Sequence, residues 1–112
     1  MATMMAVTIG PLAAREIKDH LQAEMDGGHY CDDKFEEPVN TLFTRLDEIF
    51  HSGCMAEVVV TSPEMSQMLT DAAEEIDNAA ALYEEAGDDY WAGVHRGTEG
   101  QVRRFIDAWR AA

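Results

Sequence analysis

The chain has 112 residues, with 22 Asp and Glu against 8 Lys and Arg, so its formal net charge is -14. This length indicates a single domain spanning residues 1–112, and the 46% of hydrophobic residues suffices for a buried core. So negative a chain repels phosphate, which excludes direct binding to nucleic acid or to an anionic membrane. With no long apolar run, no basic leader and two cysteines, we expect a cytoplasmic protein.

Two amphipathic helices are expected in the first half of the chain. The first begins at Pro11, a residue suited to the first helical turn, and ends at Gly27. The second runs from Pro38 to Gly53 and carries the clearest apolar face. That face comprises Val39, Leu42, Phe43, Leu46, Ile49 and Phe50. Residues 29–37 show no periodicity and are expected to form a loop.

A short β-branched run at residues 57–61 follows the second helix. The run is too short to classify by itself, but it could form a short strand paired with residues 6–9, where Val7 and Ile9 would share one face. A two-stranded ribbon, an extended loop and a helical turn are all compatible with this segment.

A third helix is expected from Ser62, as N-cap, and Pro63, as first residue, to Gly87. Its predicted buried face comprises Met65, Met68, Leu69, Ala72, Ile76, Ala79, Ala80 and Tyr83. The methionines are interpreted as core filling, although such side chains also suit a docking surface.

The last helix is expected to begin at Thr98, because Gln101 completes a capping-box pattern with it. Residues 88–97 before it would form a connector with at most one helical turn. The predicted inner face comprises Val102, Phe105, Ile106 and Trp109. The chain is therefore predicted to be mainly α, a compact four-helix bundle-like domain that allows for a small two-stranded β element.

The negative charge is concentrated in the middle of the chain. Between Arg45 and Arg96 there are 12 of the 22 acids and no Lys or Arg. Acids on the third helix between residues 71 and 85 would cover about 20 Å at the helical rise. A helix face of carboxylates at this density could occupy a cationic groove that binds phosphates. The bland alternative is a solvated face that keeps the protein soluble.

The acidic tract and the aromatic residues next to it form the predicted partner-binding site. Its residues are Asp71, Glu74, Glu75, Asp77, Glu84, Glu85, Asp88, Asp89, Tyr90 and Trp91. The carboxylates would act as phosphate surrogates, and the aromatic pair would supply apolar anchoring or else cap the core. Size and charge resemble the small acidic anti-restriction and anti-CRISPR inhibitors encoded by phages and plasmids.

Two His/Cys pairs, His29 with Cys31 and His51 with Cys54, are weak candidates for a zinc site. Neither has the spacing of a zinc knuckle, and the simpler interpretation is that each cysteine is buried as a small hydrophobe and that His51 sits at a helix C-terminus, where a cation is favourable. No cofactor is expected. Sequence context singles out no nucleophile, phosphate loop or acid pair, so the chain is expected not to be an enzyme.

The expected function is therefore non-enzymatic inhibition of a nucleic-acid-handling protein through binding to its basic surface. Two alternatives are a helical adaptor or assembly partner that docks through Met and aromatic side chains, and a zinc-binding regulator. The C-terminal arginines Arg96, Arg103, Arg104 and Arg110 would either neutralise the acidic helix or meet it in a homodimer.

Overall fold

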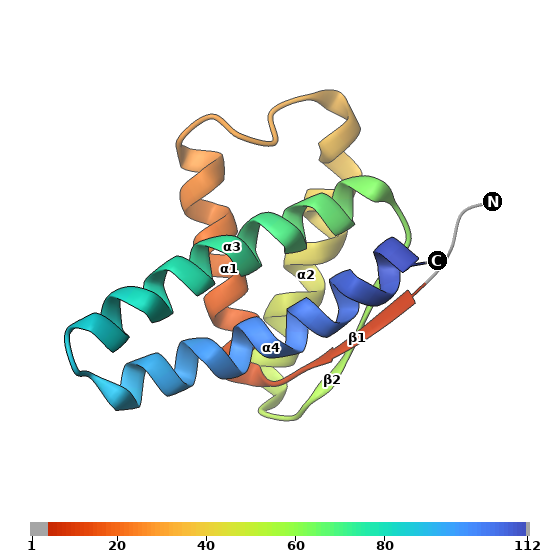
Figure 1. Cartoon of the computed structure of the whole chain (residues 1–112). Helices are drawn as coiled ribbons and strands as arrows, with labels where there is room; N and C mark the ends of the chain where they lie inside the picture. Colours follow the sequence, from red (N-terminus) through yellow and green to blue (C-terminus); the bar gives the residue numbers. More distant parts are fainter. Residues whose placement is uncertain (1–4, 112) are drawn as a thin grey trace.

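The computed structural model describes residues 5–111 and has the predicted mainly helical architecture (Figure 1). Four helices and a two-stranded antiparallel sheet follow in the order β1, α1, α2, β2, α3 and α4. Their bounds are β1 Met5–Ile9, α1 Pro11–Asp26, α2 Glu36–Ser52, β2 Ala56–Val60, α3 Pro63–Glu85 and α4 Asp89–Ala111. Helices α3 and α4 lie side by side as a hairpin across α1 and α2 (Figure 1).

Of the three alternatives left open for the segment at residues 57–61, the structure adopts the two-stranded ribbon. β1 and β2 pair antiparallel, with Val7 opposite Val58 and Met5 opposite Val60. Alternate residues of both strands are buried, so one face of the ribbon completes the core and the other meets solvent.

Helix α1 confirms the predicted start at Pro11 and stop before Gly27. Helix α2 begins two residues earlier than predicted, at Glu36, because a 3₁₀ turn at Asp33–Phe35 leads directly into it. The Phe35 side chain is buried in the core and anchors the segment 29–37, which was predicted to be a loop. Gly53 ends α2 with a positive φ of 73°, a conformation that glycine adopts without strain.

Helix α3 begins as predicted, with the Ser62 hydroxyl accepting a hydrogen bond of 3.2 Å from the Met65 amide. The predicted inner face is confirmed for most residues, including both methionines. Two predicted residues are not buried: Ala79 is only partly buried, and Tyr83, near the end of the hairpin, is 37% exposed.

The predicted start of the last helix is wrong. α4 begins at Asp89, so residues 89–97 are helical and do not form the predicted connector. The Asp88 carboxylate accepts a hydrogen bond of 3.2 Å from the Trp91 amide, so Asp88 supplies the cap that was assigned to Thr98. Thr98 is 3% exposed inside the helix, and Gln101 accepts a hydrogen bond of 3.4 Å from the Gly10 amide.

The core lies between the helix pairs and the inner face of the ribbon. Its largest fully buried side chains include Ile9, Ile17, Leu21, Leu42, Leu46, Ile49, Met68, Leu69, Ile76 and Ile106. The side chains of Phe105 and Trp109, also predicted for the inner face of the last helix, lie outside the described part of the structure.

Candidate functional site

The outer face of α3 presents a row of exposed carboxylates. Glu74, Glu75 and Glu85 are all exposed, since they lie opposite the buried Ala72, Ala73 and Ile76 stripe on this helix. No ion pair between described residues involves these three carboxylates. They are therefore available to a cation from outside the protein.

Two other predicted carboxylates already have a cationic partner on α4. The Arg96 guanidinium contacts the Asp77 carboxylate, and its second nitrogen lies 2.6 Å from Glu84. The hydrogen bonds that this guanidinium donates to the Glu84 and Asp77 carboxylates raise its pKa, so it stays positively charged. Arg96 thus neutralises the α4 side of the acidic helix and leaves the outer face negative.

Asp71 joins the acidic helix to the segment before α2. The Tyr30 hydroxyl donates to the Asp71 carboxylate at 2.6 Å, across 41 residues of sequence. Burial raises the pKa of the Tyr30 hydroxyl, with further contributions from Asp71 and from the charge of Glu24. Glu24 in turn lies 3.4 Å from His29, so acidic groups from α1 and α3 converge on this tyrosine.

The aromatic pair at the start of α4 is an exposed feature and does not cap the core. Tyr90 is 72% exposed and Trp91 is 47% exposed, with their rings in an edge-to-face arrangement at 5.2 Å. Asp88 lies in the turn between α3 and α4, and Asp89 is the first residue of α4. The four predicted residues, two acids and two aromatics, therefore lie together at one end of the hairpin.

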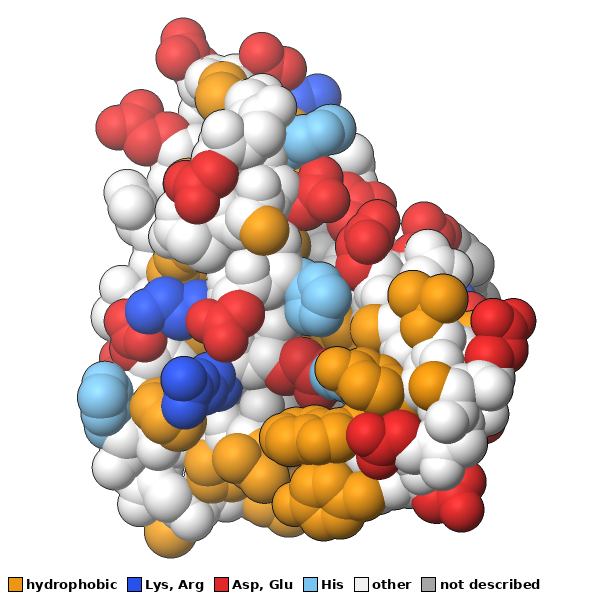
Figure 2. Space-filling model, turned by 90° about the vertical axis from the view of Figure 1, so that its left-hand side faces the viewer, with side chains coloured by type: hydrophobic (Ala, Val, Ile, Leu, Met, Phe, Trp, Pro, Cys, Tyr) orange, Lys and Arg blue, Asp and Glu red, His pale blue; other side chains and the backbone are white. Residues whose placement is uncertain are grey.

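A groove of about 520 Å³ separates the start of α4 from α1. Leu12, Asp19 and His20 line it from α1, and the Tyr90 and Trp91 pair lines it from α4. Figure 2 shows this side of the molecule, where hydrophobic side chains gather low on the face among acidic ones. The groove is therefore mixed in character, with apolar walls and a charged rim.

A partly buried polar cluster lies beneath this groove, and no motif in the sequence pointed to it. Nδ1 of His95 contacts one oxygen of the Glu16 carboxylate, and the Thr98 hydroxyl donates to the other oxygen at 2.8 Å. Tyr83 stacks on the imidazole at 5.2 Å. These groups join α1 to α4 across 79 or more residues, so no local pattern could have revealed the pairing.

The contacts of this cluster link α1 to α4. The Thr98 hydroxyl donates to Glu16, not to the imidazole, and the residues that line the groove include no Ser or Cys. A nucleophile activated by His95 would need such a group beside the ring.

The two His/Cys pairs do not converge on one site. The Cys31 thiol donates to the Gly28 carbonyl at 3.2 Å, and His29 is engaged with Glu24. His51 packs beside the Phe50 ring, and both cysteines are exposed and free. Among the described residues, no group of three or more His, Cys, Asp or Glu side chains is placed to share a metal ion.

Comparisons with known proteins add no relative: no protein family, no curated protein and no solved structure matches the chain. Within residues 5–111, no helix combines the length and the apolar composition that a bilayer span requires.

Proposed function

We propose that the protein is a non-enzymatic acidic inhibitor that binds the basic surface of a nucleic-acid-handling protein. The observation that carries this proposal is the row of unpaired carboxylates on the outer face of α3. No cation among the described side chains pairs with Glu74, Glu75 or Glu85, whereas Arg96 pairs with Asp77 and Glu84 on the other flank of α3. In this proposal the free row takes the place of nucleic-acid phosphates, as in anti-restriction and anti-CRISPR inhibitors.

The length and rigidity of α3 support this role. Its 23 residues form one continuous helix, and at the helical rise of about 1.5 Å per residue Asp71 and Glu85 lie roughly 20 Å apart. A rigid row of charges loses little conformational entropy on binding. A net charge of -14 would also accelerate encounter with a basic surface.

The experiment is capture of partners from a bacterial lysate on the immobilised protein, followed by competition with duplex DNA. The test variant combines Glu74→Gln, Glu75→Gln, Glu85→Gln and Asp89→Asn. The matched control changes four exposed acids around the connection between α1 and α2, with Asp26→Asn, Asp32→Asn, Asp33→Asn and Glu37→Gln. We expect the test variant alone to lose a partner that DNA displaces.

Both variants should retain the helical circular-dichroism spectrum, since all eight acids are exposed. Equal capture by the test variant and the wild type would contradict the proposal. So would a partner that DNA fails to displace.

A second candidate function is an adaptor that docks through the groove between α1 and α4. The observation that favours it is the exposure of Leu12 at 69% and Tyr90 at 72% beside the same groove. Binding of this kind should persist at high salt, because apolar burial is not screened. The variant Tyr90→Ala should then abolish capture, whereas Leu82→Ala, at a similarly exposed apolar residue on α3, should not.

A further inference from the structure

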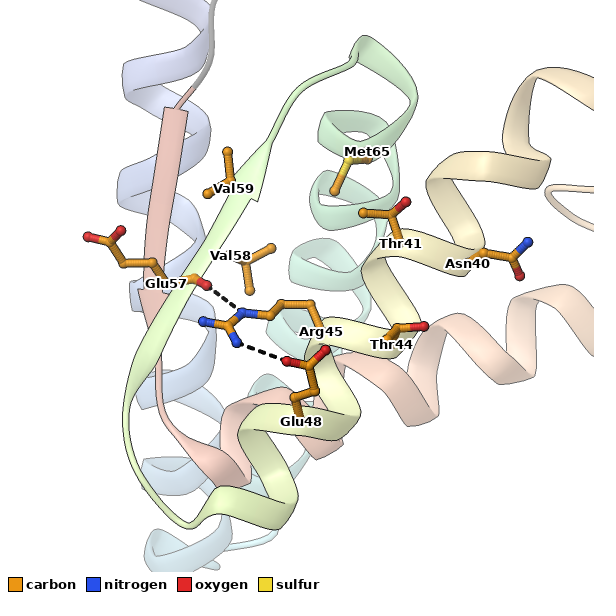
Figure 3. A pocket seen from close by; sticks show the side chains of 9 residues that line it. All are labelled: Asn40, Thr41, Thr44, Arg45, Glu48, Glu57, Val58, Val59 and Met65. Atoms are coloured by element: carbon orange, nitrogen blue, oxygen red, sulfur yellow. Dashed lines mark hydrogen bonds and ion pairs between the residues drawn. The ribbon is translucent and has the colours of Figure 1, made fainter.

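The sheet has two strands, so among the described residues no strand lies beside the outer edge of β2. Backbone groups alternate sides along a strand, so residues that pair with β1 alternate with residues that face away from it. The Arg45 Nε atom, which comes from α2, donates to the Glu57 carbonyl at 2.8 Å (Figure 3). Glu57 therefore faces away from β1, and by alternation the amide and carbonyl of Val59 do as well.

This outward edge opens into a hollow of about 660 Å³ between β2 and α2. Figure 3 shows the two elements as opposing walls, with Arg45 reaching from one to the other. The buried side chains of Val58 and Met65 line the hollow, and Thr41, Thr44 and Glu48 line it from α2. Its volume lies within the roughly 300–1,000 Å³ of typical ligand sites.

The outward backbone groups of Val59 have no partner among residues 5–111. No hydrogen bond between described residues involves them, and the Val59 side chain is 45% exposed. A strand edge with unpaired amide and carbonyl groups is a template for a further strand. Arg45 occupies the Glu57 carbonyl only, so the backbone groups of Val59 remain available to pair with another strand.

We propose that this edge binds an extended, basic peptide segment of a partner protein, which adds to β2 as a third strand. An added strand lies about 4.8 Å from its neighbour, and its side chains alternate between the two faces. One set would pack toward Val58 and Met65, and the other would meet the carboxylates of Glu48 and Glu57.

The charges around the hollow favour a basic peptide over a second copy of the chain at this edge. The one cation that lines the hollow, Arg45, is engaged with Glu48 at 3.2 Å and with the Glu57 carbonyl. Two copies paired through β2 would bring the Glu48 and Glu57 carboxylates of each toward those of the other, which is unfavourable. Lysines or arginines at alternate positions of a peptide would complement both carboxylates.

The probe is an acetylated hexapeptide of alternating valine and lysine, titrated into the ¹⁵N-labelled full chain. We expect the amide signals of Glu57 and Val59 to shift and their hydrogen exchange to slow. Val59→Pro removes the outward amide and spares the ladder to β1, because proline is tolerated at a strand edge. It should weaken binding about tenfold, the effect of one lost backbone hydrogen bond, whereas Val59→Ala should bind nearly as wild type.

Two altered peptides keep the test independent of how the variants fold. A peptide N-methylated at its central residues cannot pair, and a peptide of alternating valine and glutamate reverses the charge; neither should bind the wild-type protein. Equal binding of the N-methylated peptide would overturn the proposal, as would shifts confined to α3. Slow exchange at Val59 in a peptide-free dimer would overturn it too, because a second copy would then occupy the edge.

The inference does not depend on the function proposed for α3. The variant with four neutralised acids on the hairpin should bind the hexapeptide with nearly the wild-type affinity, since its changes leave Glu48 and Glu57 intact. Loss of peptide binding in that variant would show general charge attraction instead of strand addition.

Discussion

Side-chain contacts to two carboxylates, Glu16 and Asp71, join segments of this chain that lie far apart in sequence. Thr98 and His95 of α4 both contact the Glu16 carboxylate of α1, and Tyr30 donates to Asp71 of α3. Both carboxylates are partly buried, and the side chains that contact them replace hydrogen bonds to water. These contacts offset much of the free-energy cost of removing each carboxylate from water. These contacts fix where α1 lies relative to the hairpin, and so fix the groove between α1 and α4.

Tyr30→Phe tests the contact to Asp71. Removing the hydroxyl should lower the free energy of unfolding at neutral pH by about 1–2 kcal/mol, since a charged acceptor loses its donor. The measurement is urea denaturation followed by circular dichroism. Tyr90→Phe is the matched control, because Tyr90 is 72% exposed, and it should change the stability little.

The same two variants also test how the stability of the fold depends on pH. Because the pKa of Tyr30 is raised in the folded protein, the folded state keeps this proton where the unfolded chain loses it. The contribution of the Tyr30 hydroxyl to the free energy of unfolding is therefore complete below the ordinary pKa of 10.0, and it is lost as the pH rises above that value. Stability should fall less steeply with alkaline pH in Tyr30→Phe than in Tyr90→Phe, and parallel curves would contradict this assignment.

At the scale of elements, α4 is a helix whose sequence does not favour one. Gly93, Gly97 and Gly100 all lie within it, and glycine inside a helix costs about 0.5–1 kcal/mol relative to alanine. Packing along α3, together with the Asp88 cap, outweighs this cost. Most helical stability in proteins comes from such packing of an apolar face.

Alanine at the three glycines of α4 should therefore stabilise the protein. A Cβ atom built at Gly93, Gly97 or Gly100 meets no atom within 4 Å, so the substitutions introduce no clash. Each should raise the free energy of unfolding by about 0.5–1 kcal/mol, measured by chemical denaturation. Gly53→Ala is the contrasting control and should destabilise, because the residue has a positive φ of 73°. Loss of stability in the α4 variants would show that these glycines serve another purpose.

For the whole molecule, the dominant electrostatic feature is an excess of negative charge. Local cations such as Arg96 and Lys18 pair with nearby acids, yet the net charge of -14 leaves most carboxylates repelling one another. Self-repulsion of this kind destabilises the compact state and is screened by salt.

The midpoint of thermal unfolding should therefore rise as monovalent salt is added. Differential scanning calorimetry at low and at physiological ionic strength measures the shift. The variant with Glu74→Gln, Glu75→Gln, Glu85→Gln and Asp89→Asn should start from a higher midpoint and respond less to salt. A midpoint that falls with salt would mean that the ion pairs outweigh the repulsion.

The sequence by itself determined those features that depend on neighbouring residues. Pro11 and Pro63 marked helix starts, Gly53 marked a stop, and the acidic tract was visible as a run without cations. Apolar periodicity likewise predicted most of the buried residues of α2 and α3. Such signals are local because capping, backbone strain and amphipathicity act within a few turns of the chain.

Only the tertiary structure decided which distant residues meet. Packing against α3 made residues 89–97 helical despite their glycines, and it divided the acids into those paired with Arg96 and those left free. The Glu16, His95 and Thr98 cluster and the open edge of β2 also arise from contacts between elements remote in sequence. Their energies depend on the arrangement of whole helices and strands, which no local pattern of residues specifies.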